Sequence, residues 1–153
     1  MSPFGTAELG AAEGRPKRAA TEEKLERLLA IAAGLIARQG YEKTAIRDLA
    51  RETGSSLAGM YYYFKSKEDL LFQIQHATFR SLVEEQEAEL ARGGTAEERI
   101  SRLLVGHLEF FARHPSEMKV CTYELESLQG EPYRKVEELR RRYFKLAAGV
   151  VGE

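Results

Sequence analysis

The sequence predicts an all-α fold. Along most of the chain, apolar residues recur every three or four positions, which is the spacing of one face of an α-helix. Most of these segments follow a residue typical of a helix start, such as Ser or Thr, and end at a glycine or before a proline. No segment alternates polar and apolar residues between turn signals, as a half-buried strand would. We therefore expect helices throughout, without an internal repeat.

The composition is that of a globular protein. The 153 residues are 43% hydrophobic and 31% charged, which suffices to bury a core. The sequence has no apolar run long enough to span a membrane and no apolar segment typical of a secretory signal near its start. Its one cysteine, Cys121, has no partner for an internal disulfide, which fits a reducing compartment. These features predict a cytoplasmic protein that does not engage a membrane.

Three helices are expected in the first part of the chain. Residues 1–20 are rich in Gly, Ala and Pro and are predicted to be a flexible tail. Thr21 is predicted to cap the first helix, which ends at Gly40. Thr44 is expected to cap a short second helix ending at Gly54, and Ser55 or Ser56 a short third one. Two short helices joined by a glycine turn are typical of a helix-turn-helix, so residues 21–67 are predicted to form one domain.

A second helical domain is expected over residues 68–153. Ser66 precedes a long amphipathic segment, and Thr95 with Glu98 forms a capping-box pattern at the start of the next. Two further helices are predicted to follow, one opened by Ser116 and running to Gly130, and a last one with Pro132 at its first position. The predicted stops are Gly93-Gly94, Pro115 and Gly130.

Charge is divided unevenly along the chain. Residues 15–67 carry 11 Lys or Arg against 6 Asp or Glu, whereas residues 68–153 carry 12 against 16. A small basic unit suggests a polyanionic partner. Chance segregation of solvated charges is the alternative that charge leaves open.

The stretch GSSLAGMYYYFKSKEDLL, residues 54–71, places three tyrosines in a row beside two lysines. On a helix Met60 and Phe64 share one face, so the three phenols cannot all point inward with them. A phenol offers a ring that contacts a thymine methyl and a hydroxyl that donates to a phosphate.

The residues next to these tyrosines also favour contact with DNA. Ala58 and Gly59 are small enough to let the helix approach base edges, and Lys65 and Lys67 supply charge to the backbone. The stretch therefore predicts a surface that reads the DNA major groove.

The segment YEKTAIRDLARETGSSLAGMYYYFKSKEDLL resembles the DNA-binding region of the TetR family of bacterial transcriptional repressors. Thr53, Ser55 and Ala58 depart from the usual pattern, the first two at packing positions of the turn and the third at the reading edge. The matching positions are Gly40, Tyr41, Thr44, Ile46, Asp48, Leu49, Ala50, Gly54, Ser56, Tyr61, Tyr63, Phe64, Ser66, Lys67, Glu68 and Leu70.

The resemblance implies roles for individual residues. Arg15, Lys17 and Arg18 precede the first helix, where some family members carry a basic arm that touches a groove; solvated tail charge is the alternative. The positions that match phosphate contacts are Thr44, Tyr61, Tyr63 and Lys67. The positions that match the base-reading surface are Ser56, Leu57, Ala58, Gly59 and Tyr62.

For the second domain the resemblance implies a small-molecule effector and a homodimer. HLEFFARHPSEMKV together with ELRRRYFKLAAG is similar to the subgroup that controls fatty-acid or acyl-CoA metabolism, so a hydrophobic effector such as an acyl-CoA is expected. The candidate pocket residues, for which ordinary core packing is the alternative, are Phe72, Phe79, His107, Phe110, Phe111, Met118, Cys121, Tyr123 and Tyr143. The candidate dimer helix carries Val136, Leu139, Tyr143, Leu146 and Val150.

Two further expectations concern the end of the chain and its charges. Family members normally continue for another helix or more beyond the position of Glu153, so we expect a chain that lacks the last helix or helices or dimerises differently. Three consecutive arginines, residues 140–142, are expected to form a solvated face; the alternatives are pairing with the acidic helix around Glu84, Glu85, Glu87 and Glu89, or contact with an anionic effector.

No feature of the sequence predicts catalysis. The three histidines are separated by 31 and 7 residues, without metal-binding spacing, and there is no phosphate-cradling glycine loop. We therefore predict a repressor without catalytic residues, metal or cofactor, which a small hydrophobic effector releases from a palindromic double-stranded DNA operator. The alternatives are a truncated or effector-independent DNA-binding protein and a helical protein-interaction adaptor.

Overall fold

The computed structural model of the protein describes residues 14–152, and every regular element within that range is helical. The prediction of an all-α fold is thereby confirmed. No helix in this range is long and apolar enough to cross a membrane. The elements are α1 (Gly14–Gln39), α2 (Ile46–Thr53), α3 (Leu57–Tyr63), α4 (Lys67–Leu90), α5 (Ala96–Arg113), α6 (Pro115–Tyr123), the 3-10 helix η1 (Leu125–Ser127) and α7 (Gly130–Val151).

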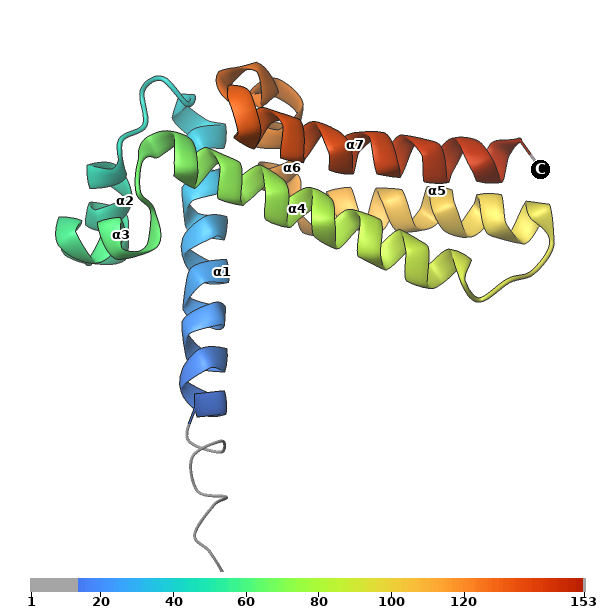
Figure 1. Ribbon diagram of the computed structural model, residues 1–153, viewed down its shortest axis with the longest axis horizontal. Helices are drawn as coiled ribbons and strands as arrows, with labels where there is room; N and C mark the ends of the chain where they lie inside the picture. The colour runs from blue at the N-terminus through green and yellow to red at the C-terminus, as the bar shows by residue number, and fades with distance from the viewer. Residues whose placement is uncertain (1–13, 153) are drawn as a thin grey trace, which may run out of the picture.

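The helices form two parts that share α4 as their connection. Figure 1 shows α1 running across the direction of α4, α5 and α7, with α2 and α3 beside its upper half. The long helices α4, α5 and α7 pack lengthwise against one another, and α6 packs on both α1 and α4. The small α1–α3 unit is therefore mounted at one end of the helical bundle.

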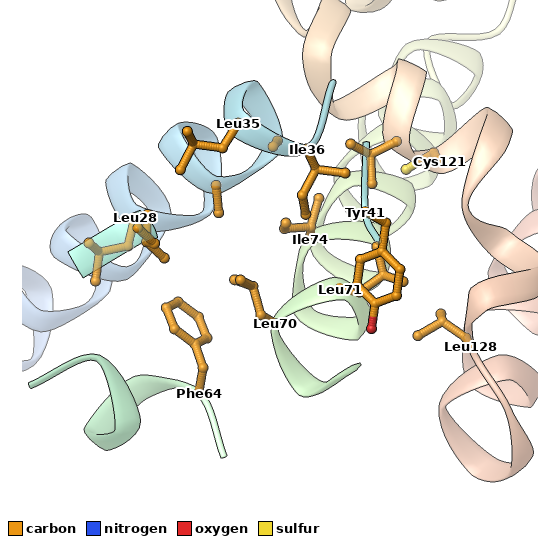
Figure 2. Packing of buried hydrophobic residues seen from close by; sticks show 14 of the residues in the cluster. Leu28, Leu35, Ile36, Tyr41, Phe64, Leu70, Leu71, Ile74, Cys121 and Leu128 are labelled. Carbon is orange, nitrogen blue, oxygen red and sulfur yellow. The ribbon is translucent and has the colours of Figure 1, made fainter. Parts of the chain in front are cut away.

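One continuous core joins the two parts. Figure 2 shows Leu28 of α1 on the side of Phe64 and Ile36 of α1 beside Ile74 of α4, with Cys121 of α6 in the same cluster. Phe64 is completely buried, and removing such a ring from water contributes about 2 to 3 kcal/mol to folding. A smaller cluster of Leu90, Leu103 and Val150 closes the far end of the bundle.

Several predicted helix ends are confirmed. Ser66 accepts a hydrogen bond from the Asp69 amide at 3.0 Å, as an N-cap does. Thr95 and Glu98 form the reciprocal capping box at the start of α5. Gly40 and Gly54 have φ values of +87° and +62°, which a glycine adopts without steric cost.

The start of α1 differs from the prediction. The helix begins at Gly14, and the Thr21 hydroxyl lies inside it, donating to the Lys17 carbonyl at 2.9 Å. Pro16 sits in the first turn, where its missing N–H costs no intrahelical hydrogen bond. The tail predicted over residues 1–20 is therefore wrong for residues 14–20, and residues 1–13 lie outside the described residues.

Three other boundaries also differ. Ala45, not Thr44, is the N-cap residue of α2, and its amide donates to the Asp48 carboxylate at 2.8 Å. The helix opened at Pro115 stops at Tyr123, because the chain tightens into η1 before Leu128. The last helix starts at Gly130, so Pro132 is its third residue and not its first.

Candidate nucleic-acid interface

The most exposed aromatic side chains of the first unit lie on α3. Met60 and Phe64 point into the core, with 1% and 0% exposure, and hold the helix to its support. Tyr61 and Tyr62 point outward, with 51% and 79% of their surface exposed. The sequence argument that at least one phenol must face outward is therefore confirmed. We call residues 46–63, which comprise α2, the turn and α3, the reading head.

The turn of the reading head depends on Gly54 and Ser56. The left-handed Gly54 lets the Ser55 amide donate back to the Ala50 carbonyl at 2.9 Å, which closes the end of α2. The Ser56 hydroxyl then accepts a hydrogen bond from the Gly59 amide at 3.0 Å and caps α3. These local bonds fix the direction in which α3 leaves the turn.

The predicted base-reading residues lie together at the start and outer face of α3. Ser56, Leu57, Ala58 and Tyr62 are exposed, and Gly59 is half-buried. Because the Ser56 oxygen already accepts the capping bond, its hydroxyl proton is the part left to address a base. A Cβ at Gly59 would lie 3.1 Å from the Ser56 oxygen, so a glycine at this position also protects the cap.

The residues predicted to contact phosphates differ in their exposure and in their hydrogen bonds. Tyr61 is exposed, and Tyr63 is half-buried with its ring edge-on to Tyr62 at 5.1 Å. The Thr44 side chain is only 3% exposed, and its hydroxyl donates to the Gly40 carbonyl at 2.8 Å. Its oxygen also accepts from Gln39 at 3.2 Å, so in this structure Thr44 holds the turn and does not offer its hydroxyl to DNA.

Lys67 and the basic residues before Thr21 are also placed by helices. The Lys67 ammonium, at the start of α4, donates to the Glu42 carbonyl at 3.2 Å. Lys17 and Arg18 are exposed on the first turns of α1, and the Arg15 backbone belongs to the same helix. The structure places residues 15–18 on a helix, where Lys17 and Arg18 expose their side chains.

The predicted pocket residues differ in their exposure. Phe79, Phe110, Met118 and Cys121 are core residues, with exposures of 7% or less. Burial raises the pKa of the Cys121 thiol to about 12, which leaves it an unreactive thiol at neutral pH. Tyr123 is 75% exposed at the end of α6. The alternative of ordinary core packing therefore describes these four buried residues.

Two of the pocket residues form a specific pair. His107 Nδ1 on α5 and the Tyr143 hydroxyl on α7 are 2.6 Å apart, and the Phe111 ring lies 4.5 Å from the imidazole. Burial lowers the pKa of His107 and raises that of Tyr143, so the pair is neutral at physiological pH. Phe72 is half-buried and packs against the core, 5.2 Å from the His76 ring.

The proposed dimer helix is oriented differently from our prediction. Val136 and Val150 of α7 are 0% and 2% exposed, because they pack inside the chain. Leu139, Tyr143 and Leu146 are half-buried against the same two clusters. A side chain already covered by its own chain cannot also cover a partner, so Val136 and Val150 do not form a dimer surface. The alternative of pairing with the acidic helix holds for Arg142, which binds both carboxylate oxygens of Glu87 at 2.8 and 2.7 Å, whereas Arg141 pairs with Glu137 within α7.

The sequence did not predict the two buried glutamines of α4. Gln75 and Gln86 are 0% and 1% exposed, and the Oε1 atom of each has no hydrogen-bond partner among the described residues. Glutamine on an amphipathic helix is usually exposed, so their identity gave no signal. Gln86 fits because it faces Gly106 on α5, where a Cβ would lie 2.4 Å from its amide nitrogen.

Comparison with known proteins places the chain among bacterial regulators. Residues 28–74 match the family described as bacterial regulatory proteins, tetR family, and residues 93–153 match a tetracyclin repressor-like C-terminal domain. The chain is 25% identical over 130 residues to the fatty acid metabolism regulator protein of Bacillus subtilis, covering 85% of this chain and 67% of that protein.

Solved structures show the same fold. The TetR family transcriptional regulator PfmR from Thermus thermophilus superposes with a TM-score of 0.77 at 30% identity, covering 82% of this chain and 68% of that one. The regulator FadR from Bacillus subtilis, solved with stearoyl-CoA, superposes with a TM-score of 0.70 at 24% identity, covering 82% and 67%. The chain thus spans about two thirds of the length of the proteins that it resembles.

Proposed function

The chain belongs to the TetR family of bacterial regulatory proteins, and on this premise we propose that it is a DNA-binding transcriptional repressor. The observation that carries the proposal is the outer edge of α3. Leu57, Tyr61 and Tyr62 are exposed there, although large apolar and aromatic side chains are usually buried. They stand on a helix that Met60 and Phe64 anchor to the core. Such an edge fits the major groove, which admits one α-helix.

The charges around this edge suit a DNA backbone. Arg47 and Arg51 of α2 and Lys65 after α3 are exposed, and they flank the tyrosines in the chain. Basic side chains of this kind neutralise phosphates and release counterions, which supplies most of the sequence-independent affinity. The exposed ring and hydroxyl of Tyr62, together with Ala58 and Leu57, would then select the bases.

We further propose that two copies bind a near-palindromic operator, with half-sites at least about one helical turn apart. The surface that supports a dimer consists of two exposed apolar stripes on the adjoining helices α5 and α7, which we call the α5–α7 stripes. Exposed apolar side chains that gather on neighbouring helices are characteristic of interaction sites. The residues of the stripes are Leu104, Leu108 and Phe111 on α5 and Phe144 and Val151 on α7.

The effector is proposed to be a hydrophobic small molecule such as an acyl-CoA. Support comes from the similarity to a fatty acid metabolism regulator and from a fold shared with a regulator solved with stearoyl-CoA. Among the expected pocket residues, Phe110 lines a groove between α1 and α4, and His107 and Tyr143 pair between α5 and α7. Linkage requires the effector to bind the free protein more tightly than the DNA-bound form.

The proposal is tested by selecting binding sites from a pool of random DNA duplexes. The expected outcome is enrichment of a near-palindrome whose affinity falls steeply with salt, with a log–log slope of about −0.9 for each neutralised phosphate. Adding an acyl-CoA series to the selected complex then tests the effector. A protein-interaction adaptor would enrich no sequence at all.

A further inference from the structure

A groove lies between the N-terminal half of α1 and the middle of α4. Its volume is about 640 Å³, within the range of small-molecule sites. Glu22, Leu25, Glu26 and Leu29 line it from α1, and this spacing of three and four residues is one face of the helix. The opposite wall comes from α4, and α5 and α6 close one end. None of the residues that we expect to contact DNA lines this groove.

The floor of the groove is apolar. Ile74 of α4 and Phe110 of α5 are each 1% exposed and form its base, and Leu25 and Leu29 of α1 are half-buried along its side. Because Ile74 and Phe110 are covered by their own chain, the surface offered to whatever occupies the groove is the half-buried hydrocarbon of Leu25 and Leu29. Such a floor favours a hydrophobic body by removing apolar surface from water.

The rim of the groove is acidic. Glu22 and Glu26 stand on α1, Glu117 on α6 and Glu85 on α4, against a single arginine, Arg80. Glu85 is neutralised by Arg113 outside the groove, and Arg80 lies within 3.9 Å of Glu84. Glu22, Glu26 and Glu117 form no ion pair with any described residue. Three unpaired carboxylates therefore surround an apolar floor.

We propose that this groove binds a small hydrophobic cation, a primary or quaternary amine that carries an aryl or alkyl group. The apolar part would cover Leu25 and Leu29, while the ammonium group would lie between the carboxylates of Glu26 and Glu117. Charge complementarity selects this class over fatty acids and acyl-CoA thioesters, whose anionic groups the rim would repel. The groove is thus a site separate from the acyl-CoA effector proposed above.

The position of the groove links its occupant to DNA binding. Helix α1 leads into the reading head and α4 leads out of it, so a bound molecule contacts both helices that hold the head. If the angle between α1 and α4 differs between the free and DNA-bound forms, the cation and the operator change each other's affinity by the same factor.

Three probes of one shape and different charge test the proposal: phenylbutylamine, phenylbutanol and phenylbutyrate. Binding is followed by the methyl chemical shifts of Leu25, Leu29 and Ile74 in the intact chain. We expect the amine to shift these methyl signals at concentrations at least about tenfold below the alcohol, and the carboxylate to leave them unchanged. The measurement needs no DNA, so its failure would leave the proposed regulator function standing.

Charge-neutral variants locate the site. The double variant E26Q/E117Q is expected to weaken amine binding by about tenfold, since each carboxylate is worth a few-fold at a partly exposed site. E23Q removes one such charge from an exposed residue of α1 outside the groove and serves as the control. Equal binding of the amine and the alcohol, equal losses in E23Q and E26Q/E117Q, or shifts confined to residues elsewhere would each overturn the proposal.

Discussion

The ammonium group of Lys67 lies 4.3 Å from the centroid of the Tyr41 ring. The first residue of α4 is thereby tied to the turn that follows α1. A cation over an aromatic face contributes about 0.5 to 1 kcal/mol at an exposed site. Lys67 therefore has a structural role besides the phosphate contact that the family pattern implies. The two roles make different predictions.

Replacing Lys67 by methionine separates these roles. If the ammonium contacts a phosphate in the complex, the log–log salt slope of operator binding becomes shallower by about 0.9. If it only holds the turn, unfolding becomes easier by about 1 kcal/mol or less and the slope stays unchanged. We expect a change in both, measured by anisotropy titrations across salt and by urea unfolding. K145M, at the far end of α7, should leave the slope unchanged.

Tyr62 tests base reading. Its side chain is 79% exposed, so Y62A should unfold at nearly the same urea concentration as the parent. Its affinity for the selected operator should fall by about 1 to 3 kcal/mol while its affinity for random DNA changes little. Y123A, which truncates a similarly exposed tyrosine on α6, provides the matched control. An equal loss of affinity for operator and random DNA would mean that Tyr62 contacts the DNA backbone and does not read bases.

Gly54 tests the backbone of the reading head. Its φ of +62° disfavours a side chain, so G54A should lower the free energy of unfolding by about 1 kcal/mol. G149A is the matched control, because Gly149 lies within α7 and a Cβ there meets nothing within 4 Å. In that helical position alanine should raise stability by about 0.5 to 1 kcal/mol. Urea unfolding of both variants measures the contrast, and losses of similar size would contradict the explanation.

The His107–Tyr143 pair makes stability depend on pH. Burial lowers the pKa of His107 in the folded state below its ordinary value of 6.5. As pH falls through 6.5, the unfolded chain gains a proton that the folded chain takes up less readily, so stability falls towards acid. Neutral H107Q should lose stability less steeply between about pH 7 and about pH 5. His76, whose pKa is also lowered by burial, would retain part of the slope, and an unchanged slope in H107Q would contradict the assignment.

The α5–α7 stripes test the dimer. Leu108 is 67% exposed, and L108E should weaken self-association by about tenfold or more, because an interface leucine is worth about 1.5 to 3 kcal/mol. Val105 is 49% exposed on the side of α5 that lines a groove against α4, next to the stripe and not part of it. V105E should leave self-association unchanged in sedimentation velocity. Equal effects of the two variants would place the dimer contact elsewhere.

The fold was predictable where a local signal decides the outcome. Ser66, Thr95 with Glu98, and the left-handed Gly40 and Gly54 mark helix ends through hydrogen bonds within a few residues. Thr44 shows where such signals fail, because its hydroxyl serves the preceding turn and the Asp48 carboxylate satisfies the Ala45 amide instead. Competing partners of similar chemistry cannot be ranked without coordinates.

The sequence also predicted part of the candidate site. The inward face of α3 followed from the spacing of Met60 and Phe64, which left Tyr62 outside. The orientation of α7 was not predictable from the sequence. Its apolar stripe would be the same whether Val136 and Val150 pack against their own chain or against a second copy. That choice depends on where α4 and α5 lie, which is a tertiary relationship.

The most direct test of the central claim is the affinity ratio between the selected operator and a scrambled duplex of equal length and composition at physiological salt. A sequence-reading α3 predicts a ratio of about a thousandfold or more for the parent protein. Its reduction in Y62A but not in Y123A would follow from the exposure of Tyr62 on the reading head. Equal affinity for the two duplexes would contradict the account.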